Sequence, residues 1–165
     1  MKQYPLLFTF HDKIEGDGFI ADVETRGRAL AVKEDDETWS IYGVQPGALA
    51  GSGRTLLEAH AEFRRTFSTV LFDLVVEALN SDAFVHEVQR FFDETDPVSV
   101  AEWEAAVTEV RAGNITPQEL QVTDDGIRKE SAASERFVRV TCKDHQLQLR
   151  ATANATDSLY LAAAA

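Results

Sequence analysis

This sequence of 165 residues is poor in several features, and each scarcity limits what the protein can be. Cys142 is the only cysteine, which excludes a disulfide within the chain and favours a reducing compartment. No apolar run is long enough to span a membrane, and the run at residues 4–10 is too short and too strand-like for a signal peptide. We therefore expect a cytoplasmic protein that makes no contact with a membrane.

Basic residues are also scarce. The chain has 16 Lys and Arg against 28 Asp and Glu, so its formal net charge is −12. Surfaces that bind nucleic acid depend on clustered Lys and Arg, and we therefore expect no direct contact with nucleic acid. A basic protein is the better electrostatic match. Two acidic runs, at residues 34–37 and 93–96, are interpreted as solvated turns.

Recognisable catalytic motifs are missing as well. The sequence has no phosphate-binding glycine pattern, no nucleophile elbow and no spaced set of metal ligands. Its sharpest polar cluster consists of His11 and Asp12 with Glu15 and Asp17 nearby, and a metal site there would need further ligands brought in by the fold. Strand-end and turn residues are the simpler interpretation. We therefore predict no catalytic residue, no cofactor and no bound metal.

What the sequence does contain is a series of short alternating segments with the apolar and aromatic content of strands. The four predicted strands are residues 4–12, 19–24, 29–33 and 38–44. Glycines and acidic residues between them predict turns at residues 15–18, 26–28 and 34–37. The small residues 48–53 are interpreted as a loop. Together these patterns indicate an antiparallel β-meander.

A long amphipathic helix is predicted over residues 56–79. Thr55 and Glu58 fit a capping box, in which the Thr hydroxyl accepts from the Glu58 amide and the Glu carboxylate reaches back to the Thr55 amide. Apolar residues then recur at spacings of three and four. Such a helix is roughly 36 Å long, which is enough to cross a small sheet. We expect it to pack on the meander.

Residues 80–165 are predicted to add two helices and a hairpin. Ser81 is expected to cap the first of these helices, and a second capping box begins at Ser99. Downstream we expect an exposed loop at residues 124–134, two hairpin strands at residues 138–142 and 147–151, and a frayed tail at residues 157–165.

The predicted fold class is therefore α+β: an antiparallel β-meander packed by a long α-helix, followed by two helices and a C-terminal β-hairpin. Residues 1–79 would form the meander and its helix. Residues 80–165 would form a helical extension and the hairpin, packed on the same domain.

Residues 1–79 resemble the amino-terminal domain of HicB-like antitoxins. In that family the strands end in a Pro-Gly turn, and a Gly-Asp-Thr-Leu-Glu-Glu-Ala run starts the helix. The matching residues here are Pro46, Gly47, Gly53, Thr55, Leu56, Glu58 and Ala59. Arg54 replaces the usual acidic residue, and Leu57 replaces a usual Glu.

The resemblance implies a partial ribonuclease-H-like fold that lacks the catalytic carboxylates of that superfamily. It also implies that the protein binds and occludes a small basic ribonuclease toxin. Typical relatives carry an additional DNA-binding segment, whereas residues 80–165 contain no basic recognition helix.

Our leading hypothesis is a non-enzymatic, acidic protein-binding module that neutralises or scaffolds a basic partner. Two alternatives stay open. One is a metal-dependent hydrolase that uses His11, Asp12 and Asp17, and the other is an immunity or anti-defence protein whose carboxylates mimic nucleic acid. A homo-oligomer is compatible with all of them.

Overall fold

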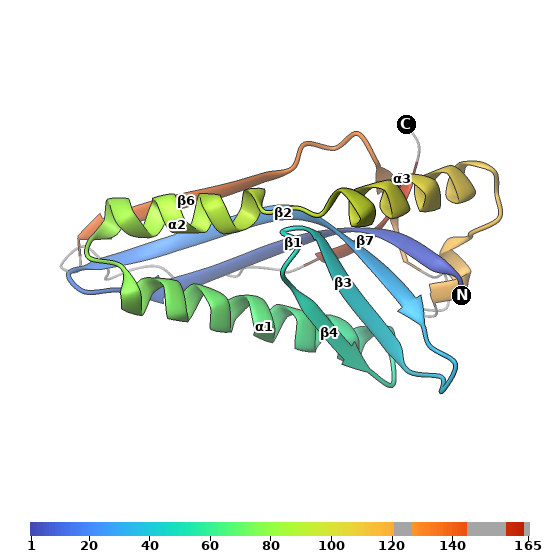
Figure 1. Cartoon of the computed structure of the whole chain (residues 1–165), viewed down its shortest axis with the longest axis horizontal. Helices are drawn as coiled ribbons and strands as arrows, with labels where there is room; N and C mark the ends of the chain where they lie inside the picture. The colour runs from blue at the N-terminus through green and yellow to red at the C-terminus, as the bar shows by residue number, and fades with distance from the viewer. Residues whose placement is uncertain (121–126, 145–157, 164–165) are drawn as a thin grey trace.

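The computed structural model describes residues 1–120, 127–144 and 158–163. It has the mixed α+β content that the sequence predicts (Figure 1). In chain order the elements are β1 (Gln3–Glu15), β2 (Phe19–Lys33), β3 (Trp39–Gln45), β4 (Ala50–Gly53), α1 (Leu56–Glu77), α2 (Ser81–Asp93), α3 (Pro97–Arg111), the 3-10 helix η1 (Pro117–Leu120), β5 (Lys129–Ser131), β6 (Phe137–Asp144) and β7 (Ser158–Ala163).

One mostly antiparallel sheet joins the strands, and the long β1–β2 hairpin is its centre. The hairpin register runs from Gln3 opposite Val32 to Glu15 opposite Ile20. On the free edge of β2, β6 pairs with the first half of the strand and β3 with the second half. β4 pairs with β3, β7 pairs with β1, and β5 adds a parallel strand beside β7.

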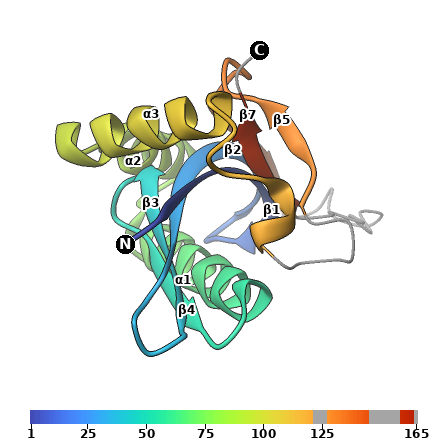
Figure 2. The same ribbon diagram turned by 90° about the vertical axis from the view of Figure 1, so that its right-hand side faces the viewer.

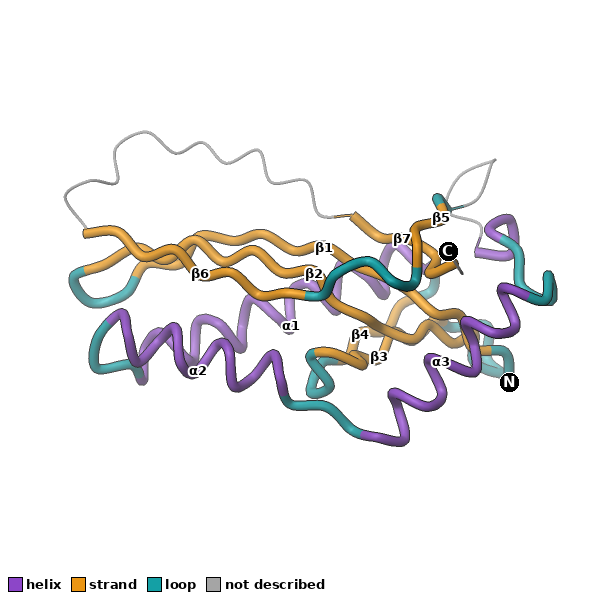
Figure 3. Tube along the Cα trace, turned by 90° about the horizontal axis from the view of Figure 1, so that it is seen from above, coloured by secondary structure: helices purple, strands orange, loops and turns teal. Residues whose placement is uncertain are grey.

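The helices lie on both faces of this sheet. α1 and α2 share one face, because buried side chains of both helices belong to one core cluster. Seen from above, α2 and α3 lie along the same long edge of the strands (Figure 3). α3 covers the opposite face near the end where β1 begins (Figure 2). Among the described residues, no helix combines the length and the apolar character needed to cross a membrane.

Side chains that alternate along β1 supply the core on both faces. The Phe8 ring meets Phe63 of α1 edge-on at 5.1 Å between centroids, and Phe10 stacks on Phe67 at 4.4 Å. Leu7 points to the other face, into the cluster that contains Trp103 of α3. β1 is thereby buried on both faces at this point, and it fixes the positions of α1 and α3 together.

The start of α1 confirms the predicted helix. The Glu58 amide donates to the Thr55 hydroxyl oxygen at 3.1 Å, as in a capping box. The Glu58 carboxylate accepts from the Arg54 amide at 2.7 Å, one residue before the expected donor. The helix ends at Glu77, close to the predicted end at residue 79.

The predicted turn at residues 26–28 is wrong, because β2 continues through it from Phe19 to Lys33. Gly27 lies opposite Phe8 of β1, and a side chain at Gly27 would collide with the Phe8 ring and with the Gln45 carbonyl oxygen. The glycine therefore permits close packing within the sheet rather than a turn. The register to β3 shifts between Arg28 and Ala29.

Two further segments predicted as loop or tail are strands. Within residues 48–53 lies β4, and the tail contains β7, in which Leu161 and Ala162 are fully buried. β5 also lies within the segment predicted as an exposed loop, residues 124–134. Low strand propensity hid these strands in the sequence, and pairing with neighbouring strands outweighs it.

The caps of the two later helices also differ from prediction. Asn80 caps α2 in place of Ser81, and its side-chain oxygen accepts from the Ala83 amide at 2.8 Å. Asp96 caps α3 by accepting from the Ser99 amide at 3.0 Å, so Ser99 lies inside the first turn. β6 confirms the first predicted hairpin strand, whereas residues 147–151 lie outside the described residues.

The close approach of β4 to α1 gives the first prediction. A methyl group at Gly51 would lie 2.5 Å from the Ala59 carbonyl oxygen and closer still to the Phe63 amide nitrogen. Both are helix backbone and cannot move aside. Gly51→Ala should therefore lower the free energy of unfolding by about 1–3 kcal/mol in urea denaturation.

The matched control is Ser52→Ala, at the exposed neighbouring position of the same strand. It should change the free energy of unfolding by less than about 0.5 kcal/mol. Equal stability of the two variants would contradict the packing described for β4.

Candidate functional site

The Pro-Gly turn of the family resemblance is a docking point for another part of the chain. Pro46 and Gly47 follow β3, and the Gly47 amide donates to the Glu94 carbonyl oxygen at 2.9 Å. A Cβ at Gly47 would lie 3.0 Å from that same oxygen. The turn therefore holds the segment that links α2 to α3, and a side chain at position 47 would press on the Glu94 carbonyl oxygen.

The remaining motif residues hold α1 against β4. A Cβ at Gly53 would lie 2.7 Å from the Ala59 amide nitrogen, and Ala59 is fully buried. Thr55 and Glu58 satisfy amides at the helix start. The described contacts of these residues serve packing and capping.

The structure separates the three residues of the hypothetical metal site. His11 points to one face of the sheet, where its Nε2 contacts Asp22 Oδ1. Asp12 points to the opposite face and accepts from the Ser68 hydroxyl of α1 at 3.0 Å. Asp17 lies exposed in the β1–β2 turn. In the described ranges no group of three His, Cys, Asp or Glu side chains is placed to hold a metal ion.

Cys142 lies half-buried on β6, opposite Ala21 of β2. Burial and the nearby Asp82 carboxylate raise the pKa of its thiol above the usual value. Because the thiolate is the nucleophilic form, this environment makes the cysteine less reactive.

Arg28 joins α3 to the sheet. Its guanidinium carbon lies 4.2 Å from the centre of the Trp103 ring, a cation–π contact between β2 and α3. Burial and the neighbouring Arg136 lower the pKa of Arg28 to about 10. Trp103 of α3 also donates from its Nε1 to the Leu6 carbonyl oxygen of β1 at 3.2 Å. These contacts fix which side of α3 faces solvent.

α2, the linker and α3 follow one another along the upper side of the molecule in Figure 1, and this stretch is rich in acidic residues. Residues 81–111 contain two arginines, Arg90 and Arg111, and eight acidic residues. The acidic residues are Asp82, Glu87, Asp93, Glu94, Asp96, Glu102, Glu104 and Glu109. Two positive and eight negative charges give −6, which is half of the net charge of the whole chain. We call residues 81–111 the acidic surface.

The carboxylates of the acidic surface are available to a partner. All of them are exposed except Glu87, which is half-buried and paired with Arg90. Asp96 stays ionised to unusually low pH, because hydrogen bonds from the backbone amide and the hydroxyl of Ser99 lower its pKa. Within residues 81–111, the local sequence pattern indicates only the acidic run at residues 93–96. The wider signal is that acidic residues recur along both helices with few basic ones between them.

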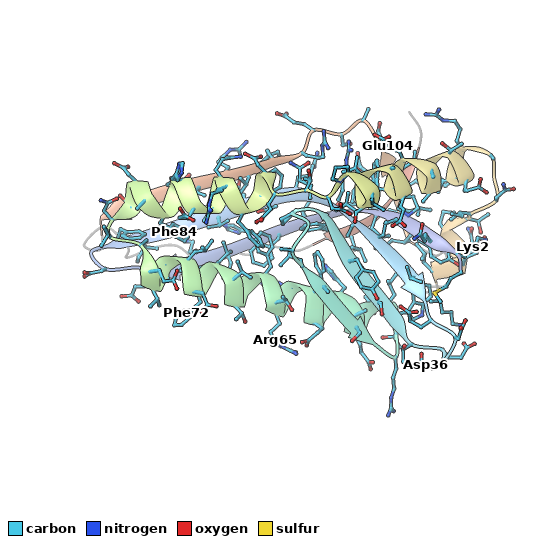
Figure 4. The ribbon with its side chains drawn as sticks, viewed as in Figure 1. Lys2, Asp36, Arg65, Phe72, Phe84 and Glu104 are labelled. Atoms are coloured by element: carbon cyan, nitrogen blue, oxygen red, sulfur yellow. The ribbon has the colours of Figure 1, made fainter. Side chains whose placement is uncertain are left out.

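A second unusual surface lies on α1. Phe72, Val76 and Leu79 are 60%, 67% and 92% exposed, and Leu57 near the start of the helix is 55% exposed. Phe72 points away from the sheet, whereas Glu104 points outward from α3 on the other side of this view (Figure 4). In the sequence, the spacing of Phe72, Val76 and Leu79 is the signal that indicates an apolar stripe opposite the buried one.

Searches of protein-family models, of curated proteins and of solved structures each find no match for this chain. The functional argument therefore rests on the surfaces of the chain itself.

His60 on α1 generates a prediction about pH. Burial, with a smaller effect from Arg64, lowers the pKa of its imidazole below the ordinary value. The unfolded chain therefore binds a proton at His60 at a higher pH than the folded chain does. The stabilising contribution is complete above about pH 6.5 and is lost as the pH falls through the folded-state pKa.

Chemical denaturation of wild type and His60→Gln at pH 7.5 and pH 5 measures this contribution. The loss of stability on acidification should be smaller in His60→Gln, and Arg64→Gln should reduce it to a lesser degree. An identical loss in wild type and His60→Gln would show that the imidazole is not shielded as described.

Proposed function

We propose that the chain is a non-enzymatic protein-binding module that takes up a basic protein on the acidic surface. The observation that carries this proposal is that residues 81–111 hold −6 of the net charge of −12. A concentration of charge of one sign attracts an oppositely charged partner, raises the rate of association and disfavours partners of like charge. Binding of this kind weakens as salt is added.

The rigid attachment of the acidic surface supports the proposal. The Gly47 turn holds the linker, and the contacts of Trp103 with Leu6 and Arg28 hold α3. Charged groups that are already in place lose little freedom when a partner binds, so more of the attraction remains as affinity. The acidic surface is thus preorganised for recognition.

The finer form of the proposal takes the partner as a small basic ribonuclease toxin, in a cytoplasmic toxin–antitoxin pair. The resemblance of residues 1–79 to HicB-like antitoxins supports it, as does the single cysteine, which favours a reducing compartment. Neutralisation would then consist of covering the basic substrate-binding surface of the toxin.

The concentration of carboxylates on successive helices also supports a second candidate, a nucleic-acid mimic that occupies the basic groove of another protein. The identity of the partner separates the two candidates. A ribonuclease neighbour in the genome favours the antitoxin, and a DNA-binding or restriction protein favours the mimic.

The test is affinity purification of the tagged chain from its native host at moderate salt, followed by mass spectrometry. We compare wild type with the double variant Glu94→Lys and Glu102→Lys, which reverses two exposed charges of the acidic surface. The matched control is Asp17→Lys with Asp35→Lys, two exposed carboxylates in turns elsewhere.

We expect a stoichiometric basic partner with wild type and the control, and at least a tenfold weaker complex with the acidic-surface variant, about 1.4 kcal/mol. The proposal fails if wild type yields only background proteins. It also fails if both double variants retain the partner equally well.

A further inference from the structure

Three arginines come together where β2 changes its partner strand from β6 to β3. Arg26 and Arg28 are two residues apart on β2, so their side chains point to the same face of the sheet. Arg136 directly precedes Phe137, the residue of β6 that lies opposite Arg26. Burial first and Arg136 second lower the pKa of Arg28, which places these two guanidinium groups close enough to repel. We call Arg26, Arg28 and Arg136 the arginine cluster.

A β-bulge in β3 arranges this cluster. Ala29 lies opposite Gly43 and Arg28 lies opposite Gln45, so β3 has one residue more than β2 at this point. The Gln45 side-chain oxygen accepts a hydrogen bond from Arg136 at 3.1 Å. Gln45 thereby holds Arg136 next to the position of Arg28. Bulges are common beside functional sites, where they redirect a side chain.

Arg28 is the most firmly held member of the cluster. Its guanidinium carbon lies 4.2 Å from the centre of the Trp103 ring, and its Nη2 lies 3.5 Å from the Ala132 carbonyl oxygen, at the limit of a hydrogen bond. Its Nε is buried and has no hydrogen-bond partner among the described residues. A partly buried cation with so few acceptors is unfavourable, and an anion beside it offsets that cost.

No carboxylate of the described residues pairs with the arginine cluster. Elsewhere Arg65 pairs with Glu62, Arg90 with Glu87 and Arg139 with Glu24. The Glu24 carboxylate, two residues before Arg26, is therefore already engaged. Glu104 attracts Arg28 from beyond ion-pair distance and points outward from α3 (Figure 4). In a chain with 28 acidic residues, three neighbouring arginines without an acidic partner indicate a site for an external anion.

A phosphate group is the anion that matches three guanidinium groups. The guanidinium fork binds carboxylate or phosphate through paired N–H donors. A carboxylate has two oxygens and one charge, whereas a phosphate monoester at neutral pH carries close to two charges and three strongly accepting oxygens. The donors and the charge of the arginine cluster exceed what one carboxylate can satisfy.

We propose that the arginine cluster binds a phosphate group, either free or carried by a small phosphate monoester. Arg28, packed on Trp103, supplies a donor that is already in place, and Arg26 and Arg136 supply the others. The missing acidic partners, the bulge and the contact between Gln45 and Arg136 carry this inference. The site lies outside residues 81–111 and does not depend on the function proposed for the acidic surface.

The first test is an NMR titration of the isotope-labelled chain with sodium phosphate at constant ionic strength. At about pH 7.5 the phosphate is mostly dianionic. The amide signals of Gly27, Arg28 and Phe137 should shift to saturation with a Kd of about 1 mM or tighter. Acetate, titrated in the same way, should bind at least about tenfold more weakly, because it brings fewer oxygens and less charge.

Substitutions within the cluster test which residues bind the phosphate. Arg136 is exposed, and Arg136→Gln should weaken phosphate binding at least about fivefold while the melting temperature stays unchanged. Arg136→Lys keeps the charge without the paired donors, so its affinity should lie between those of Arg136→Gln and wild type. Arg26→Gln repeats the measurement at a second member of the cluster. The matched control is Arg65→Gln on α1, which changes the net charge equally and should bind phosphate like wild type.

Phenyl phosphate distinguishes the two sources of the phosphate group. Binding at the same amides, at least as tight as that of inorganic phosphate, assigns a phosphate monoester as the ligand, whereas binding of inorganic phosphate alone assigns the free ion. The absence of saturable shifts with both probes overturns the proposal. Equal binding of acetate overturns the assignment to phosphate, and equal weakening by Arg136→Gln and Arg65→Gln overturns the assignment to the cluster. Arg136→Gln should still retain the basic protein partner, which separates this inference from the proposed function.

Discussion

The burial of β1 on both of its faces is the constraint on which the rest of the structure depends. Phe8 and Phe10 pack against α1. Leu7, which lies between Leu6 and Phe8 in the strand, points to the other face and enters the cluster that contains Trp103 of α3. A strand buried in this way can shift neither along its partner nor out of the sheet without exposing apolar groups on two sides. Both candidate surfaces are positioned by this strand, because α1 carries the exposed apolar residues and α3 carries three of the eight acidic residues of the acidic surface.

The sequence predicts the elements whose signals are local. The α1 capping box and its apolar spacing specify that helix, and the alternation in β3 and β6 identifies those strands. Prediction from the sequence fails where the same residue type can serve either a turn or close packing. Gly27 and Gly51 have the sequence signature of turns and loops, yet each allows close contact between backbone and neighbouring atoms inside the fold. The sequence does not predict β7, because its residues form a strand by pairing with β1 and β5, and these neighbours are distant in the sequence.

The candidate site illustrates the same division between local and distant information. The motif around Pro46 and Thr55 could be found in the sequence, and the structure places it at joints between elements. The candidate surfaces depend on exposure instead. Leu71 and Phe72 are adjacent apolar residues, and only the packed helix determines that the first is buried and the second faces solvent. The separation of His11 from Asp12 has a similar cause, since neighbouring residues of a strand point to opposite faces.

The central claim is that the chain works by contact, with the acidic surface as its recognition site. Hydrogen–deuterium exchange of the chain, alone and in complex with the co-purified basic protein, measures this most directly. The account predicts slower exchange or altered protection concentrated in residues 81–111, with α1 unchanged by the partner. Protection confined to α1 or to the β1–β2 hairpin, with residues 81–111 unaffected, would contradict it.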